Sequence, residues 1–168
     1  KAHEEFSGKK LQYFDHEENK SYTPYVVETS IGLDRMFLAI FSNSLVEEEL
    51  DNNTTRTVLK LPAVLAPTKA AILPLVKKDG LPEVARQIMK DLSWDFNVFY
   101  DEKDAVGKRY RRQDAAGTPF CITVDHQTLE DKSVTIRHRD TMEQKRVKIT
   151  ELKELIHAEV AVKNWLQR

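Results

Sequence analysis

The sequence predicts an α/β protein whose main domain is a five-stranded mixed sheet with helices on both faces. Three observations lead to this fold class. Apolar runs of strand length alternate with amphipathic helical segments between residues 69 and 124. Two further strand-like segments and a last amphipathic helix follow them. A β-hairpin and a helix, set off by a polar stretch, precede the domain.

The pattern of apolar residues predicts the first strand, the first helix and the second strand of the domain. Residues 69–76 form a nearly continuous apolar run, which is typical of a strand buried on both faces. Pro82 suits the first turn of a helix, where its missing N–H costs nothing, and an apolar stripe continues from there to Leu92. Residues 96–100 form the next strand, so the order strand-helix-strand is expected.

The second half of the domain repeats this alternation. Asp104 can cap a helix that runs to about Ala116, and Gly117 provides its left-handed stop. The remaining expected elements are strands at residues 120–124, 133–139 and 144–149 and a final helix capped by Thr150.

A hairpin and a helix are expected before this domain. Residues 10–14 and 22–28 have strand-like patterns and flank a turn-like polar segment. Apolar positions then recur at helical spacing over residues 33–50.

The main domain boundary is predicted at residues 51–55, because this polar stretch has no apolar side chain to bury and is expected to be a mobile loop. It separates residues 1–55 from residues 56–168, which are numerous enough to bury an independent core. The chain does not begin with methionine, and residues 1–25 carry little that could close a core. We therefore expect a fragment that begins inside a larger domain.

Composition narrows the possible functions. The net charge of −1 argues against unspecific coating of DNA but allows a local RNA site at the basic run 108–112. The single cysteine, Cys121, lies in an apolar run and predicts a buried, inert thiol. The five histidines show no metal-ligand spacing, so no metal site of protein ligands is expected. No apolar run could span a bilayer and no signal peptide opens the chain, which predicts a cytoplasmic protein without a membrane partner.

The most informative segment covers residues 26–35 and reads Val-Val-Glu-Thr-Ser-Ile-Gly-Leu-Asp-Arg. It gathers an anion, a hydroxyl, a small glycine and a permanent cation at a predicted strand-to-helix junction. Such a junction suits a ligand with an ammonium at one end and phosphates at the other. Judged from spacing alone, a surface glutamate at Glu28 and a helix-capping serine at Ser30 are the simpler interpretation.

The spelling Glu-x-Ser-x-Gly-x-Asp-Arg resembles the third signature motif of class II aminoacyl-tRNA synthetases, and specifically of the glycyl-tRNA synthetases. Downstream, the residues similar to the anticodon-binding domain of the glycyl, histidyl, prolyl and threonyl synthetases are 66–75, 107–114, 117–120 and 134–140. The resemblance covers nearly the whole chain. It implies the C-terminal part of a homodimeric enzyme that joins glycine to tRNA(Gly) through glycyl-adenylate, with residues 1–55 as a remnant of the catalytic domain.

The resemblance also implies the site residues. Glycine would be bound by Glu28, Thr29, Ser30, Ile31 and Gly32. ATP, accompanied by Mg²⁺, would be bound by Gly32, Leu33, Asp34 and Arg35, with Arg35 as the catalytic cation. The anticodon would be bound by Lys108, Arg109, Arg112, Arg137 and Arg139. From the residues alone, the basic helix could equally be a solvated face, and Arg137 or Arg139 could instead be structural, paired with Asp114 or Asp140.

Two departures limit the resemblance. The first and second class II motifs are absent, so the chain alone is expected not to aminoacylate. Ala115 and Ala116 replace a glutamate and an isoleucine of many relatives, so a base contact from that glutamate is not carried over. The main alternative is a non-catalytic nucleic-acid-binding protein with a synthetase-like fold, such as a polymerase accessory subunit, although such a protein need not keep the motif together. A metabolite-binding α/β domain also fits the fold, but residues 77–80 lack a glycine-rich phosphate loop.

Overall fold

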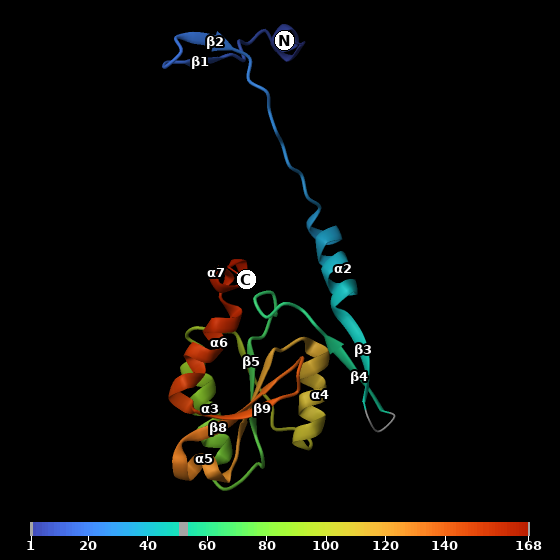
Figure 1. The fold of residues 1–168 in the computed structure, drawn as a ribbon, viewed down its shortest axis with the longest axis vertical. Coiled ribbons are helices and arrows are strands. Elements are labelled where there is room, and N and C mark those ends of the chain that lie inside the picture. Colours follow the sequence, from blue (N-terminus) through green and yellow to red (C-terminus); the bar gives the residue numbers. More distant parts are fainter. Residues whose placement is uncertain (1, 51–53, 168) are drawn as a thin grey trace. The chain divides into compact units, whose positions relative to one another are not determined.

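The computed structural model describes residues 2–50 and 54–167 and divides into two compact units, Lys1–Met36 and Phe37–Arg168 (Figure 1). Helix α2 (Leu33–Ser44) spans the division between them. Within the described part of the chain, no helix combines the length and the apolar character that crossing a membrane requires.

The first unit contains the short helix α1 (Ala2–Ser7) and an antiparallel hairpin of β1 (Tyr13–Asp15) and β2 (Lys20–Tyr22). The carboxylate of Asp15 accepts two backbone N–H bonds within the turn, at 2.9 and 3.2 Å. The predicted hairpin is confirmed, but the predicted strand over residues 22–28 is wrong beyond Tyr22. Among the described residues no strand pairs with that segment, so its backbone has no ladder to join.

The predicted helix over residues 33–50 is wrong from residue 45 onward. Helix α2 ends at Ser44, and β3 (Leu45–Leu50) pairs antiparallel with β4 (Thr54–Leu59). The register places Glu48 opposite Arg56, and this cross-strand ion pair favours a strand over the acidic stretch.

The predicted loop at residues 51–55 falls partly outside the described residues, which exclude 51–53. Thr54 and Thr55 belong to β4, so that part of the loop prediction is wrong. The hairpin of β3 and β4 lies in the Phe37–Arg168 unit and contacts helix α4 (Val106–Ala116). The domain boundary between residues 55 and 56 stays a prediction.

The predicted five-stranded mixed sheet is confirmed (Figure 1). Its strands are β5 (Ala70–Pro74), β6 (Val98–Tyr100), β7 (Phe120–Val124), β8 (Ser133–His138) and β9 (Gln144–Lys148). The order across the sheet is β6-β5-β7-β8-β9. Strand β5 runs parallel to both of its neighbours, whereas β8 runs antiparallel to both β7 and β9.

Helices cover both faces of this sheet, as predicted. On one face, Ile72 of β5 belongs to a core cluster with Ile88 of α3 (Leu81–Leu92) and Ile156 of α6 (Leu152–Val160). On the other face, Ala71 and Leu73 pack with Cys121 and with Tyr110 of α4. Alternate residues of β5 therefore face two different cores, which explains why the whole strand is apolar.

The helix ends differ in detail from the predictions. Gly117 is left-handed with φ 80° and ends α4 as predicted, but Ala105 and not Asp104 is the N-cap. Thr150 lies inside a 3₁₀ turn (Ile149–Glu151) that leads into α6, and a separate helix α7 (Val162–Leu166) follows. The sequence analysis missed α5 (His126–Asp131), whose N-terminus is closed by a reciprocal capping box between Asp125 and Thr128.

Candidate nucleic-acid interface

Helix α4 carries three of the residues predicted to bind RNA, and it turns them in two directions. Arg109 is buried with 2% of its surface exposed, whereas Lys108 and Arg112 are exposed. The two arginines therefore have different environments although they are only three residues apart, because Arg109 turns inward to the ends of the strands and Arg112 lies at the surface.

The guanidinium of Arg109 joins the ends of two strands. One nitrogen donates to the carbonyl of Pro74 at 2.7 Å and to that of Asp101 at 3.1 Å. The other donates to the carbonyl of Leu75 at 3.3 Å. Pro74 ends β5 and Asp101 follows β6, so Arg109 stabilises the place where both parallel strands end.

Arg112 is held on the surface by two acids. It donates to the carboxylates of Asp101 at 2.7 Å and Asp104 at 2.8 Å, and to the carbonyl of Lys103 at 2.6 Å. Hydrogen bonds to these carboxylates raise the pKa of Arg112. Burial alone would raise the pKa of Asp101, but hydrogen bonds from Arg112 and from the Lys103 backbone outweigh it, and this pKa is lowered. The planar fork of Arg112 therefore has a fixed orientation and remains partly open to solvent.

Arg137 and Arg139 are buried, with 5% and 3% of their surfaces exposed. Arg137 forms a bidentate pair with Asp114 and lies over the ring of Tyr110 at 4.9 Å. Arg139 pairs with Asp140 and donates to the carbonyls of Gly117 and Leu61. Each arginine thus pairs with one of the acids that the structural interpretation named, Arg137 with Asp114 and Arg139 with Asp140. Their direct contact with an anticodon, like that of Arg109, stays a prediction.

One central residue of this network escaped the sequence analysis. Arg56 of β4 is 3% exposed and donates to the carboxylate of Asp114 at 3.0 Å and to the carbonyl of Arg139 at 3.1 Å. It also pairs with Glu48. No local pattern around Arg56 indicates a partner so far along the chain, so only the tertiary structure identifies it.

The basic side chains that remain available gather at one edge of the sheet. Because β5, β6 and β7 are parallel, their carboxyl ends share an edge, and the strand order reverses between β5 and β7, the kind of crevice where open α/β sheets bind ligands. Lys77 follows β5, Lys103 follows β6, and Lys108 lies in the first turn of α4. All three are exposed, and none forms an ion pair with a described carboxylate.

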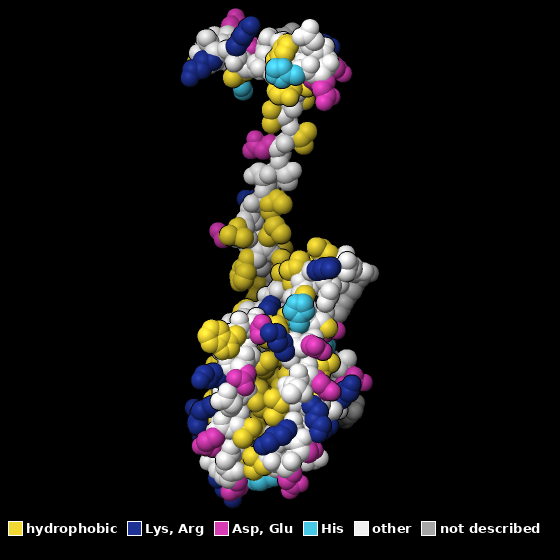
Figure 2. All heavy atoms as spheres, turned by 90° about the vertical axis from the view of Figure 1, so that its left-hand side faces the viewer, with side chains coloured by type: hydrophobic (Ala, Val, Ile, Leu, Met, Phe, Trp, Pro, Cys, Tyr) yellow, Lys and Arg dark blue, Asp and Glu magenta, His cyan; other side chains and the backbone are white. Residues whose placement is uncertain are grey.

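The acids at the same edge are already paired. Asp101 and Asp104 hold Arg112, and Asp125 pairs with Arg146. A hydrogen bond from Arg146 is the main reason that the pKa of Asp125 is lowered. Elsewhere on the Phe37–Arg168 unit the charge is mixed: on the face shown in Figure 2, Lys and Arg side chains alternate with Asp and Glu. Anion binding at this edge therefore depends on the three lysines without ion pairs, and not on a uniformly positive surface.

The predicted glycine and ATP residues lie together in sequence and all are exposed. Residues 23–32 are outside helices and strands, and Leu33, Asp34 and Arg35 form the first turn of α2. A Cβ added at Gly32 would meet only the Arg35 side chain, at 3.6 Å or more. The geometry within this chain thus brings Gly32 and Arg35 together and leaves Glu28 and Ser30 open to solvent. The roles of these residues stay predictions.

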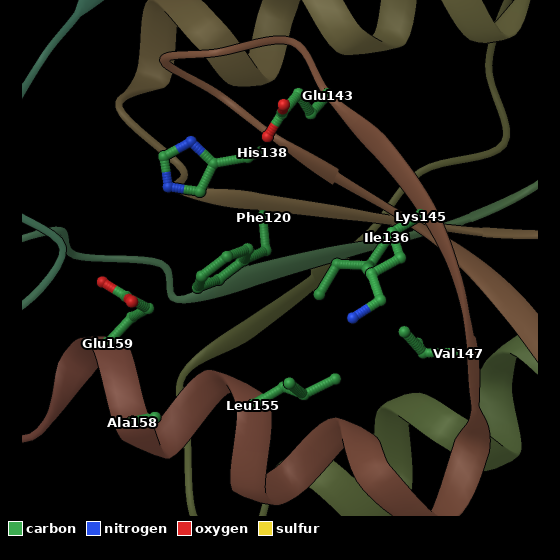
Figure 3. A pocket seen from close by; sticks show the side chains of 9 residues that line it. All are labelled: Phe120, Ile136, His138, Glu143, Lys145, Val147, Leu155, Ala158 and Glu159. Atoms are coloured by element: carbon green, nitrogen blue, oxygen red, sulfur yellow. The ribbon is translucent and has the colours of Figure 1, made fainter.

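A shallow pocket lies at the opposite edge of the sheet, between the β8–β9 end and α6 (Figure 3). Phe120, Ile136 and Val147 line it from the sheet and Leu155 from the helix, with His138, Glu143 and Glu159 at its rim. It contains none of the residues predicted to bind a ligand. Among the described residues, no group of three or more His, Cys, Asp or Glu side chains is arranged to hold a metal ion.

Comparison with curated proteins finds close relatives. A glycine–tRNA ligase from Clostridium beijerinckii is 54% identical over 156 residues, which cover 93% of this chain and 33% of that protein. One from Borrelia hermsii is 49% identical over 160 residues, covering 94% of this chain and 36% of that protein. One from Rhodopirellula baltica is 55% identical over 150 residues, covering 87% and 28%. The chain spans about a third of the length of these relatives.

Solved structures support the fold. The RNA binding domain of threonyl-tRNA synthetase from Cryptosporidium parvum Iowa II superposes with a TM-score of 0.55 at 24% identity, covering 60% of this chain and 25% of that chain. A prolyl-tRNA synthetase from Cryptosporidium parvum superposes with a TM-score of 0.56 at 18% identity, covering 72% and 32%. A family model described as "Anticodon binding domain" matches residues 69–159. Since this match covers more than half of the 168 residues, the chain belongs to the anticodon binding domain family.

Proposed function

We propose that the chain is part of a glycine–tRNA ligase, in which it recognises the anticodon of tRNA(Gly) and contributes one edge of the site that activates glycine with ATP. The observation that carries this proposal is the anticodon-binding fold, with free lysines at the carboxyl edge of its parallel strands. Its similarity to named glycine–tRNA ligases over nearly its whole length supports the choice of glycine. The complete enzyme is proposed to act as a cytoplasmic homodimer.

RNA binding is assigned to the carboxyl edge of the sheet. Lys77, Lys103 and Lys108 are exposed cations without ion-pair partners, which suits contacts to phosphate oxygens. Arg112 presents a planar guanidinium that two carboxylates and one carbonyl orient. This suits stacking on an unstacked loop base, together with a single hydrogen bond from a remaining N–H to the edge of a base. In this assignment the lysines supply affinity and Arg112 supplies discrimination between bases.

Glycine activation is assigned to the exposed segment 28–35. The carboxylate of Glu28 binds the ammonium of glycine, and Ser30 accepts a second bond from it while its bulk excludes larger amino acids. Arg35 binds phosphate oxygens of ATP, whose charge Mg²⁺ also balances. The glycine carboxylate then attacks the α-phosphate, the bond to the β-phosphate breaks, and glycyl-adenylate and pyrophosphate form. The other groups that this step needs belong to the parts of the ligase that the chain does not span.

Two measurements test the proposal. The 168-residue chain is titrated with the anticodon stem-loop of tRNA(Gly) and with matched stem-loops of other anticodons, and tighter binding of the first is expected. Glycine-dependent pyrophosphate exchange is then measured for the chain alone, where background is expected, and for the complete ligase, where activity is expected. Equal binding of all stem-loops would contradict anticodon recognition. RNA binding without exchange in the complete protein would favour the non-catalytic alternative.

A further inference from the structure

The environment of Arg109 differs from that of Lys108 and Arg112, the other residues of α4 that were predicted to bind RNA. Arg109 is 2% exposed, and it forms no ion pair with any described carboxylate. Among the described residues, its terminal nitrogens donate to the carbonyl oxygens of Pro74, Leu75 and Asp101. Its Nε is buried without a hydrogen-bond partner. A buried cation of this kind is costly, which indicates that its position serves a purpose beyond simple packing.

The three carbonyls lie where β5 and β6 pass into the two loops of the carboxyl edge. Pro74 ends β5 and Leu75 begins the loop that carries Lys77, whereas Asp101 begins the loop that carries Lys103. The first loop is also fixed to β7, because the N–H of Leu75 donates to the carbonyl of Val124 at 2.8 Å. Since a guanidinium is a rigid planar fork, it sets the spacing between the acceptors that it joins.

Arg109 and Arg112 act on the same residue from different sides. Arg109 holds the carbonyl of Asp101, and Arg112 holds its carboxylate. The orientation of the Arg112 fork therefore depends on the place where Arg109 fixes the backbone of Asp101. Direct contact between Arg109 and RNA would require its guanidinium to leave all three carbonyls, and these would then lose their donors.

We infer that Arg109 is a positioning residue for the RNA site: it fixes the two loops that carry Lys77 and Lys103 and thereby orients Arg112, without touching RNA. This inference rests on the proposed RNA-binding function. In this inference Arg109, the least exposed residue of the basic run, holds the site in shape, while its exposed neighbours Lys108 and Arg112 contact the RNA.

The test compares Arg109→Lys with Ile156→Ala in the 168-residue chain. Lysine keeps the charge but cannot join the two loops with a planar fork. Ile156 is fully buried on α6 and provides a control that lowers stability without changing these loops. Affinity for the anticodon stem-loop of tRNA(Gly) is measured by titration, and backbone order by amide hydrogen exchange.

Arg109→Lys is expected to weaken binding by about 10-fold and to speed amide exchange in residues 75–80 and 101–105, with β8 and β9 unchanged. Ile156→Ala is expected to change affinity by less than about two-fold, as distant sites usually act independently. Weaker binding with unchanged exchange in the two loops would show a direct contact and overturn the inference. Faster exchange with unchanged affinity would show a purely structural role and would also overturn it.

A measurement on the unaltered chain covers the case in which Arg109→Lys does not fold. The Nε–H of Arg109 is expected to give a slowly exchanging resonance in nitrogen-edited NMR spectra, and to stay protected at the same position when the stem-loop is added. A large shift of that resonance on binding would mean that RNA reaches the guanidinium. If the unaltered chain binds no stem-loop, the proposed function fails and this inference fails with it. If it binds and only the Arg109 results disagree, the inference alone fails.

Discussion

Arg137 and Asp114 form a bidentate ion pair inside the Phe37–Arg168 unit, with N–O distances of 2.8 and 3.0 Å. Asp114 has no exposed surface and also accepts from Arg56. Asp114→Ala would leave two buried guanidinium groups without their shared carboxylate, so a loss of about 3–5 kcal/mol in unfolding free energy is expected. Urea denaturation measures this loss. Asp104→Ala removes an exposed acid from the same region and should leave the unfolding midpoint nearly unchanged; an equal effect of both variants would contradict the buried network.

Alanine substitutions at Gly117 and Gly107 are expected to change the stability of the chain in opposite directions. Gly117 has φ 80°, and an added Cβ would lie 3.2 Å from the carbonyl oxygen of Leu59. Gly117→Ala is therefore expected to destabilise the chain by at least about 1 kcal/mol. Gly107 lies inside α4 with open space around its Cβ position, so Gly107→Ala should stabilise by about 0.5–1 kcal/mol. Thermal denaturation of both variants checks the two signs, and a stabilising Gly117→Ala would refute the left-handed helix end.

The thiol of Cys121 is expected to be unreactive in the folded chain. It is 1% exposed, and burial raises its pKa to about 12, so hardly any thiolate exists at pH 8. A colorimetric thiol reagent should therefore detect no free thiol in native buffer and one per chain in concentrated urea. Rapid labelling of the native chain at pH 8 would mean that β7 opens easily.

Lys108→Ala is expected to weaken binding of every anticodon stem-loop by a similar factor, because a phosphate contact carries no sequence information. The slope of log affinity against log salt should become shallower by about 1. Titrations at two salt concentrations measure both effects. Lys163→Ala on α7 removes another exposed cation and serves as the control. Selective loss of the cognate stem-loop in Lys108→Ala would instead assign base recognition to this lysine.

Arg35→Ala in the complete ligase should lower glycine-dependent pyrophosphate exchange by on the order of 100-fold, because a cation that stabilises developing phosphate charge acts mainly in the chemical step. Binding of tRNA should hardly change. Arg35→Lys keeps the positive charge but loses the planar guanidinium, so its exchange rate should lie between those of the unaltered ligase and Arg35→Ala. Lys20→Ala, in β2 of the same unit, is the control. Unchanged exchange in Arg35→Ala would leave this residue with no catalytic role.

The sheet could be predicted from the sequence mainly because its three inner strands, β5, β7 and β8, have the patterns that burial imposes. The run from Ala70 to Pro74 is apolar on both faces, and Gly117 and Pro82 mark helix ends by their backbone geometry. Elements that depend on distant partners could not be predicted. The acidic strand β3 exists because it pairs with β4, and α5 has too few residues to show a helical period, although Asp125 and Thr128 have the spacing of a capping box.

The candidate site was predicted at the level of the segment and not of the side chain. Only the fold places the basic run on α4 beside the carboxyl edge, and the sequence does not show which arginines point inward. Arg109 and Arg112 are one turn apart and have the same charge, yet one joins strand ends and the other lies on the surface. Lys77 and Lys103 reach the same edge only through the parallel pairing of β5 and β6. That pairing connects residues too distant for any local pattern to reveal.

Strand β5, an interior strand of the sheet, is the first of the five strands to be synthesised. β5 lies between β6 and β7, so a nascent chain that ends at Leu92 holds this apolar strand with both edges unpaired. Its second neighbour is complete only once translation has passed Val124. During synthesis, β5 must therefore wait until the long segment between it and β7 has been made and the two strands can pair. Until then β5 is the exposed segment that a chaperone would protect from aggregation.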